Sequence, residues 1–92
     1  MAIGARELED LLVGKYSFER IPGKKHNKYG LFVGGKRVAT TYLSGLTGDI
    51  DDTLLGAITK QMFVTMGQFK GMKACHIEPN GYLAILRERG RL

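Results

Sequence analysis

The stretch "KYGLFVGGKRVATTYL", residues 28–43, carries the clearest local signal in this 92-residue chain. Two runs rich in β-branched and aromatic residues flank Gly34-Gly35, and glycine readily takes the positive φ that both central positions of a type I′ turn require. The sequence therefore predicts a β-hairpin with a two-residue turn. Its register would place Val33 opposite Lys36, Leu31 opposite Val38, Tyr29 opposite Thr40 and Asn27 opposite Tyr42.

The two faces of this hairpin are expected to differ, because side chains alternate between the faces of a strand. The apolar face, which should lie on the core, carries Tyr29, Leu31, Val33, Val38 and Tyr42. The other face should meet solvent and carries Lys28, Phe32, Arg37 and Thr41, with His26 added if the strand begins early enough.

The residues before the hairpin predict a helix and a strand. Leu8, Leu11 and Leu12 have the spacing of a helix over residues 5–13, and Gly14 is expected to end it in the left-handed conformation. In "KYSFER", residues 15–20, aromatic and charged residues alternate, which predicts a strand that ends before Pro22-Gly23.

The residues after the hairpin change to a helical period. A helix is expected over residues 51–66, with Asp51 as its N-cap and Ile50 packed against Leu55. Its apolar stripe contains Leu54, Leu55, Ile58, Met62 and Met66. Pro79 is expected to open a further helix, with Leu83 and Leu86, that ends before Gly90.

The predicted order is therefore α-β-β-β-α with a C-terminal helical extension, an α+β architecture. A three-stranded antiparallel sheet would carry helices on one face and leave the other face to solvent. We expect a single domain over residues 1–92, with a core at 5–66 and the extension at 67–92, since so short a chain has no room for a second core.

The net charge of +5 is concentrated in one part of the chain. Residues 15–37 carry an excess of +6, because Glu19 is the only acid among them. The basic residues are Lys15, Arg20, Lys24, Lys25, Lys28, Lys36 and Arg37. Such a concentration attracts polyanions, nucleic acid above all. A solvated face that aids solubility is the open alternative.

Cysteine content and hydropathy indicate the cellular compartment in which the protein is expected. The single Cys75 cannot form an internal disulfide, and the N-terminal residues lack the order of a secretory signal, so we expect a cytoplasmic protein. No apolar run approaches the roughly 20 residues that cross a bilayer, and no membrane association is expected.

The segment Gly23-Lys24-Lys25-His26 directly precedes the first strand of the hairpin, and Ile50, Leu54, Ile58 and Lys60-Gln61 follow in the region of the next helix. In this order of elements, residues 5–66 resemble the HicA-type toxins, small mRNA interferases with a double-stranded-RNA-binding-domain-like fold. The resemblance implies RNA as the substrate, cleavage without a metal or cofactor, and a cognate antitoxin protein as partner.

The resemblance also implies His26 as the catalytic residue. An imidazole with a pKa of about 6.5 can accept or donate a proton at neutral pH. The residues expected to bind RNA are Lys24, Lys25, Lys28, Phe32, Lys36 and Arg37. Because transesterification usually needs a base and an acid, a lysine or water would take the second role. From the residues alone, an exposed His26 that binds phosphate without catalysis is the favoured reading, and the resemblance makes the two readings about equal.

Two further functions stay open at this point. One is a non-catalytic RNA-binding module that reads duplex shape and phosphates. The other is an interaction protein whose sheet face docks an acidic partner, a role that an exposed Phe32 among cations also suits.

Three other motifs have simpler explanations. Cys75-His76 lacks the four-ligand spacing of a zinc site and is interpreted as partly buried packing. The acids Asp49, Asp51 and Asp52 are typical of a helix N-terminus and are preferred there to a metal site. "VGGK" lacks the spacing of a phosphate-binding loop and is explained by the hairpin turn.

Overall fold

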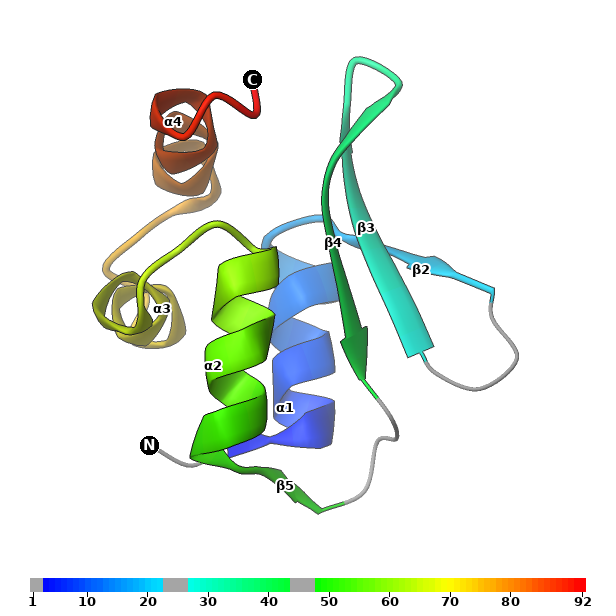
Figure 1. The fold of residues 1–92 in the computed structure, drawn as a ribbon, viewed down its shortest axis with the longest axis vertical. Coiled ribbons are helices and arrows are strands. Elements are labelled where there is room, and N and C mark those ends of the chain that lie inside the picture. Colours follow the sequence, from blue (N-terminus) through cyan, green and yellow to red (C-terminus); the bar gives the residue numbers. More distant parts are fainter. Residues whose placement is uncertain (1–2, 23–26, 44–47) are drawn as a thin grey trace.

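The computed structural model of the protein describes residues 3–22, 27–43 and 48–92. It has an α+β architecture with a three-stranded antiparallel sheet in the order β2-β3-β4 and a two-stranded sheet β1-β5, as Figure 1 shows. The elements are β1 (Ile3–Gly4), α1 (Ala5–Glu9), η1 (Asp10–Lys15), β2 (Glu19–Ile21), β3 (Asn27–Val33), β4 (Lys36–Leu43), β5 (Asp49–Ile50), α2 (Asp52–Gln61), α3 (Met66–Lys73) and α4 (Pro79–Glu88). The predicted fold class is thus confirmed.

The first helix is longer than predicted, because α1 continues into the π-helical segment η1. Gly14 lies inside η1, and Ser17 takes the left-handed conformation that was expected of Gly14, with a φ of 63°. The N–H of Phe18 donates to the carbonyl of Leu12 at 2.9 Å and closes the end of the helix. The wide π-helical turn therefore moves the helix end beyond the glycine.

The strand predicted over residues 15–20 begins later than the alternation indicates. β2 starts at Glu19, because Tyr16 and Phe18 are needed in the core, where both pack against Tyr82. The ring centres of Tyr16 and Tyr82 are 5.6 Å apart in an edge-to-face arrangement, and those of Phe18 and Tyr82 are 6.1 Å apart in a stacked one. Contacts with a distant helix thus override the local β pattern.

The hairpin has the predicted turn but a different register. Gly34 and Gly35 have φ values of 59° and 80°, as a type I′ turn requires. A β-bulge then leaves Val38 as an extra residue on β4. Val33 still pairs with Lys36, but beyond the bulge the pairs are Leu31 with Ala39, Tyr29 with Thr41 and Asn27 with Leu43. The predicted register is therefore wrong by one residue from the bulge onward.

The helix predicted over residues 51–66 is divided in two. Asp51 caps α2 as predicted, with its carboxylate 2.7 Å from the backbone nitrogen of Leu54. The helix ends at Gln61, and Thr65 begins α3 through a capping box with Gln68. The capping box starts a new helix because the Thr65 and Gln68 side chains accept hydrogen bonds from backbone N–H groups that have no partner within the helix at its N-terminus. Met66 therefore opens α3. Leu54, which was placed in the apolar stripe of the predicted helix, is exposed and does not lie in the core.

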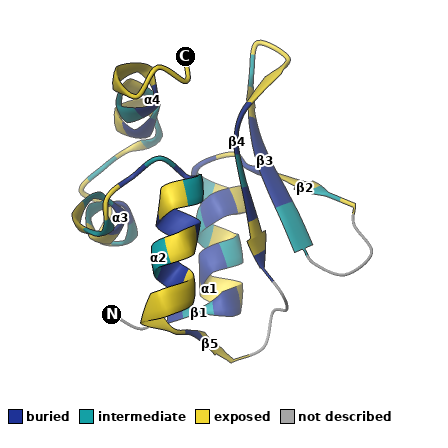
Figure 2. Cartoon of the chain, in the orientation of Figure 1, coloured by how far each residue is buried: buried dark blue, intermediate teal, exposed yellow. Residues whose placement is uncertain are grey.

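The C-terminal segment packs into the same core as the rest of the chain. α4 begins at Pro79 as predicted, and the Tyr82 hydroxyl donates to the carbonyl of Met62 at 2.9 Å. The core cluster includes Phe69, Met72 and Leu86, and buried residues run through β3, β4 and the helices in Figure 2. Within the described residues, no helix is long and apolar enough to pass through a membrane.

Candidate nucleic-acid interface

The side of the three-stranded sheet turned away from the core is the open face. The strand register assigns to it Glu19, Ile21, Lys28, Gly30, Phe32, Arg37, Thr40 and Tyr42. Phe32 and Tyr42 keep 39% and 42% of their surface exposed, although large apolar side chains are usually buried. The open face therefore presents two aromatic rings to solvent.

The bulge at Val38 determines which residues of β4 reach this face. Thr41 was predicted on the solvent side and Tyr42 on the core side, and both predictions are wrong because the register shifts by one. Thr41 is fully buried and its hydroxyl donates to the Gln61 side-chain oxygen at 2.7 Å. Tyr42 instead pairs with Lys28, whose ammonium nitrogen lies 5.9 Å from the ring centre. A cation and an aromatic ring are thus held together on the open face.

Gly30 lies at the centre of the open face and makes room for its neighbours. A Cβ atom at this position would come within 2.8 Å of the Ile21 side chain and within 3.2 Å of the Arg37 and Phe32 side chains. All three side chains therefore lean over the glycine. Phe32 and Arg37 also lie opposite each other across β3 and β4, so a second aromatic residue and a second cation are neighbours on the open face.

The residues proposed from the sequence fall into three groups. Lys28, Phe32 and Arg37 lie together on the open face. Lys36 pairs with Val33 at the hairpin tip, which puts it on the opposite side of the ribbon. His26, Lys24 and Lys25 lie outside the residues that the structure describes, and His26 directly precedes Asn27, the first residue of β3.

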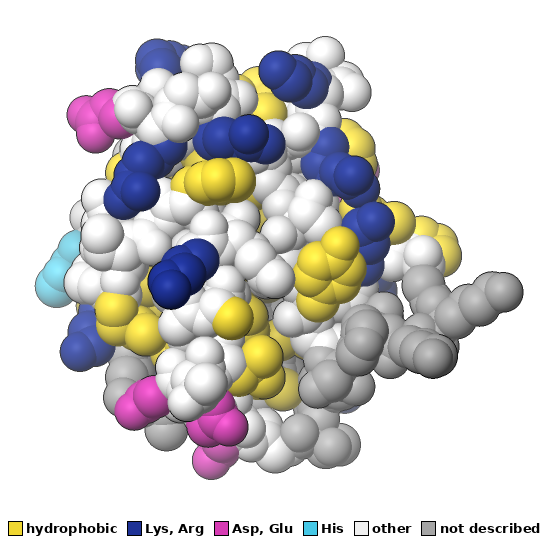
Figure 3. Space-filling view, in the orientation of Figure 1, with side chains coloured by type: hydrophobic (Ala, Val, Ile, Leu, Met, Phe, Trp, Pro, Cys, Tyr) yellow, Lys and Arg dark blue, Asp and Glu magenta, His cyan; other side chains and the backbone are white. Residues whose placement is uncertain are grey.

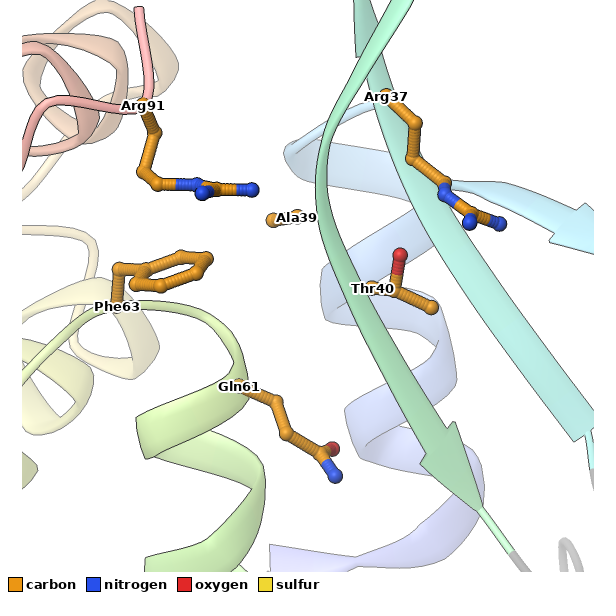
Figure 4. Close-up of a pocket in the computed structure, with 6 residues that line it drawn as sticks. All are labelled: Arg37, Ala39, Thr40, Gln61, Phe63 and Arg91. Carbon is orange, nitrogen blue, oxygen red and sulfur yellow. The ribbon is translucent and has the colours of Figure 1, made fainter.

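A hollow of about 370 Å³ adjoins the open face at the edge of the sheet, where β4 has no neighbouring strand. Its lining residues are Arg37, Ala39, Thr40, Gln61, Phe63 and Arg91, and we call it the edge hollow. Arg91 reaches it from the end of the chain, with its guanidinium carbon 4.6 Å from the centre of the Phe63 ring. In Figure 4 the guanidinium lies over that ring and points toward β4.

Sequence reasoning missed Phe63 and Arg91 as candidate residues. Phe63 was expected inside a continuous helix, but it takes a φ of 63° in the connection between α2 and α3. Arg91 lies beyond the predicted end of the last helix, yet its Nε–H donates to the carbonyl of Val38 at 3.2 Å. Val38 is the residue that the bulge removes from regular pairing, so no local pattern in the sequence could reveal this contact.

Positive side chains dominate the part of the surface around the edge hollow. In Figure 3, Lys and Arg side chains extend in a band from α4 to the hairpin. The acidic side chains gather mainly over β5 and the start of α2, away from this band. Among the lining residues of the hollow, none is acidic. The surface near β4 therefore suits an anionic partner.

The buried side of the sheet is tied to the first helix. The Tyr29 hydroxyl donates to the carboxylate of Glu9, although the two residues lie 20 positions apart. Burial raises the pKa of Tyr29, and its hydrogen bond to Glu9 acts in the same direction. This contact holds β3 against the helices and leaves its other side free.

The remaining candidate residues have other positions. Cys75 and His76 were predicted to be partly buried, but both are exposed in the turn after α3, where Cys75 takes a φ of 64°. Asp51 is the helix cap described above, and Asp49 lies in β5. In the described part of the chain, no three His, Cys, Asp or Glu side chains come together as metal ligands would.

Fold and site together define an α+β protein with one open, aromatic and basic sheet face, bordered by an arginine-lined hollow. No family model, no curated protein and no solved structure matches the chain.

Proposed function

We propose that this protein is a HicA-like RNA-binding protein that binds RNA on its open face and cleaves it as a metal-independent endoribonuclease. The observation that carries the RNA-binding part is that each exposed aromatic residue lies opposite a cation across β3 and β4, Tyr42 opposite Lys28 and Phe32 opposite Arg37. The catalytic part rests on the resemblance of residues 5–66 to HicA-type toxins and on His26.

The open face suits unpaired RNA. Bases that are not in a duplex stack on exposed aromatic rings, at about 1–3 kcal/mol for each base, and nearby cations neutralise the phosphates between them. Phe32 and Tyr42 would supply the stacking surfaces, and Lys28 and Arg37 the positive charge. A single-stranded segment of an mRNA is therefore the substrate that these side chains favour.

His26 is proposed as the general acid or base of cleavage. It directly precedes β3, the strand that carries Lys28 and Phe32. It would act on the 2′-hydroxyl or on the leaving oxygen, while a lysine or water takes the second proton-transfer role. Because His26 is the only histidine proposed for the cleavage site, where a base and an acid are both needed, the ribonuclease activity should be modest. We further propose a cytoplasmic location and a cognate antitoxin that covers the basic face.

The test is an RNA cleavage assay in the presence of a metal chelator, with three proteins. The unchanged protein should cleave a single-stranded RNA, His26→Ala should not, and His76→Ala should cleave like the unchanged protein. His76 is the matched control because it is the other of the two histidines and is exposed. If the RNA stays intact with all three proteins, the catalytic part of the proposal is wrong.

The salt dependence of RNA binding separates the remaining alternatives. Phosphate binding predicts that the logarithm of the association constant falls linearly with the logarithm of salt concentration. Steep dependence without cleavage would favour a non-catalytic RNA-binding module. Absence of RNA binding would favour a protein that docks an acidic partner through the same face.

A further inference from the structure

The edge hollow joins the open face through two shared residues, Arg37 and Thr40. Arg37 lines the hollow and also leans over Gly30 on the open face. Thr40, another residue of the open face, lines the hollow as well. A strand of RNA that crosses β4 from the open face would therefore pass directly over the hollow.

Two contacts orient the Arg91 side chain at this place. Its guanidinium stacks on the Phe63 ring, and its Nε–H donates a hydrogen bond to the Val38 carbonyl. The terminal Nη groups provide further donors in the same plane, since a guanidinium has five N–H donors in a fixed fork. Such a fork matches a phosphate group, and fixing it in advance lowers the entropy lost on binding.

The chemistry of the hollow selects an anion of limited size. Its volume of about 370 Å³ is in the range of small-ligand sites, and its lining combines two arginines with a hydroxyl and an amide. With no carboxylate among the lining residues, a phosphate would meet only attractive charges there.

We propose that the edge hollow binds a nucleotide phosphate at the Arg91 guanidinium, next to Arg37 and Thr40 of the open face, so that the C-terminal end of the chain is part of the RNA-binding surface. This inference rests on the proposed function in one respect, namely that the bound phosphate belongs to an RNA strand. A free mononucleotide carries the same group, and separate measurements distinguish the two sources.

The RNA measurement compares the salt dependence of binding for three proteins. Arg91→Gln should weaken binding of a single-stranded RNA about tenfold in 0.1 M salt and lower the salt slope by about 1. Arg6→Gln removes the same charge from the exposed surface of α1 and should leave the slope unchanged. If the Arg91→Gln and Arg6→Gln variants bind RNA with the same affinity and the same salt slope, the inference is wrong while the proposed function stands.

A double-mutant cycle tests whether Arg37 and Arg91 hold different phosphates of one RNA strand, since Figure 4 shows their side chains on different sides of β4. The loss in Arg37→Gln with Arg91→Gln should equal the product of the single losses to within about twofold, because separate contacts act independently. If the double loss is smaller than that product by about threefold or more, the two arginines share one phosphate and the assignment of the hollow's phosphate to Arg91 alone is wrong. Circular dichroism of each variant confirms that the fold is intact.

The second arm uses adenosine 5′-monophosphate and needs no RNA. Its addition should shift the Arg91 Nε–H signal in a ¹H–¹⁵N spectrum of the whole protein, and it should not shift that of Arg6. An unshifted Arg91 signal overturns the inference. If the unchanged protein fails to bind RNA but Arg91 responds to the mononucleotide, the proposed function fails and the hollow is a nucleotide site.

Discussion

Lys28 and Tyr42 face each other across β3 and β4, with the Lys28 ammonium nitrogen 5.9 Å from the centre of the Tyr42 ring. The pair exists because the bulge at Val38 turns Tyr42 outward and Thr41 inward. In the regular register Tyr42 would lie in the core, and the open face would carry one exposed aromatic ring fewer. The bulge therefore shapes the surface that we propose for RNA.

Removing either exposed ring should weaken RNA binding. Phe32→Ala and Tyr42→Ala should each lower affinity for a single-stranded RNA by about 1–3 kcal/mol, because each loses one stacking surface. Fluorescence anisotropy with a labelled oligonucleotide measures the change. Val13→Ala is the control, since Val13 is exposed to a similar extent, 41%, but lies in η1. Equal affinities for all four proteins would show that bases do not stack on the open face.

Neutralising the acid on the open face should strengthen RNA binding. Glu19 pairs with Gly30 and is exposed, so its carboxylate repels phosphates that approach Lys28 and Arg37. Glu19→Gln should tighten binding about twofold to fivefold at low salt, with the difference shrinking as salt screens the charges. Glu7→Gln, a change of the same kind on exposed α1, serves as the control. A weaker complex in Glu19→Gln would contradict phosphate binding at this face.

Filling the space above Gly30 should disturb binding more than folding. In Gly30→Ala the new Cβ would meet the Ile21 Cδ1 methyl group, the edge of the Phe32 ring and the Arg37 Cδ atom, so these side chains would have to shift. The loss of backbone freedom in the unfolded chain offsets part of the crowding, so we expect stability to change by less than about 1 kcal/mol. RNA affinity should fall severalfold because Phe32 and Arg37 are displaced.

Gly14→Ala is the matched control for that change. Nothing lies within 4 Å of a Cβ at Gly14, and its backbone is helical. Urea denaturation measures stability and anisotropy measures binding for both variants. Unchanged RNA affinity in Gly30→Ala would show that the side chains over the glycine do not contact RNA.

Stability should fall at high pH because of Tyr82. Burial raises the pKa of Tyr82 in the folded state above its ordinary value of 10.0. Below pH 10 the residue is protonated in both states, whereas above it the unfolded chain ionises first, so stability is lost as pH rises. The expected contribution is a loss of about 1 kcal/mol at pH 11.

Tyr82→Phe isolates this contribution. The variant loses the hydrogen bond to the Met62 carbonyl, so it should be less stable by about 1 kcal/mol at pH 7. It cannot ionise, so the difference from the unchanged protein should vanish or reverse near pH 11. Urea denaturation at both pH values measures the free energies of unfolding. A difference that stays constant with pH would show that Tyr82 ionises equally in both states.

Local chemistry was sufficient for much of the fold. The two glycines determine the hairpin turn, Asp51 determines the start of α2, and Pro79 determines the start of α4. Phe32, Lys28 and Arg37 could be placed on one face because all three depend on strand alternation. In each case neighbours in the sequence supply the physical cause.

Contacts between distant segments decided the rest. The bulge at Val38 brings Thr41 to Gln61 in α2 and leaves a carbonyl for Arg91, 53 residues further along the chain. The sequence by itself determined the fold class, the hairpin turn, the starts of α2 and α4, and the basic character of the hairpin region. Only the tertiary structure decided that Tyr42 faces solvent and that Arg91 and Phe63 border the same sheet, since packing energy and not local pattern selects the register of β4.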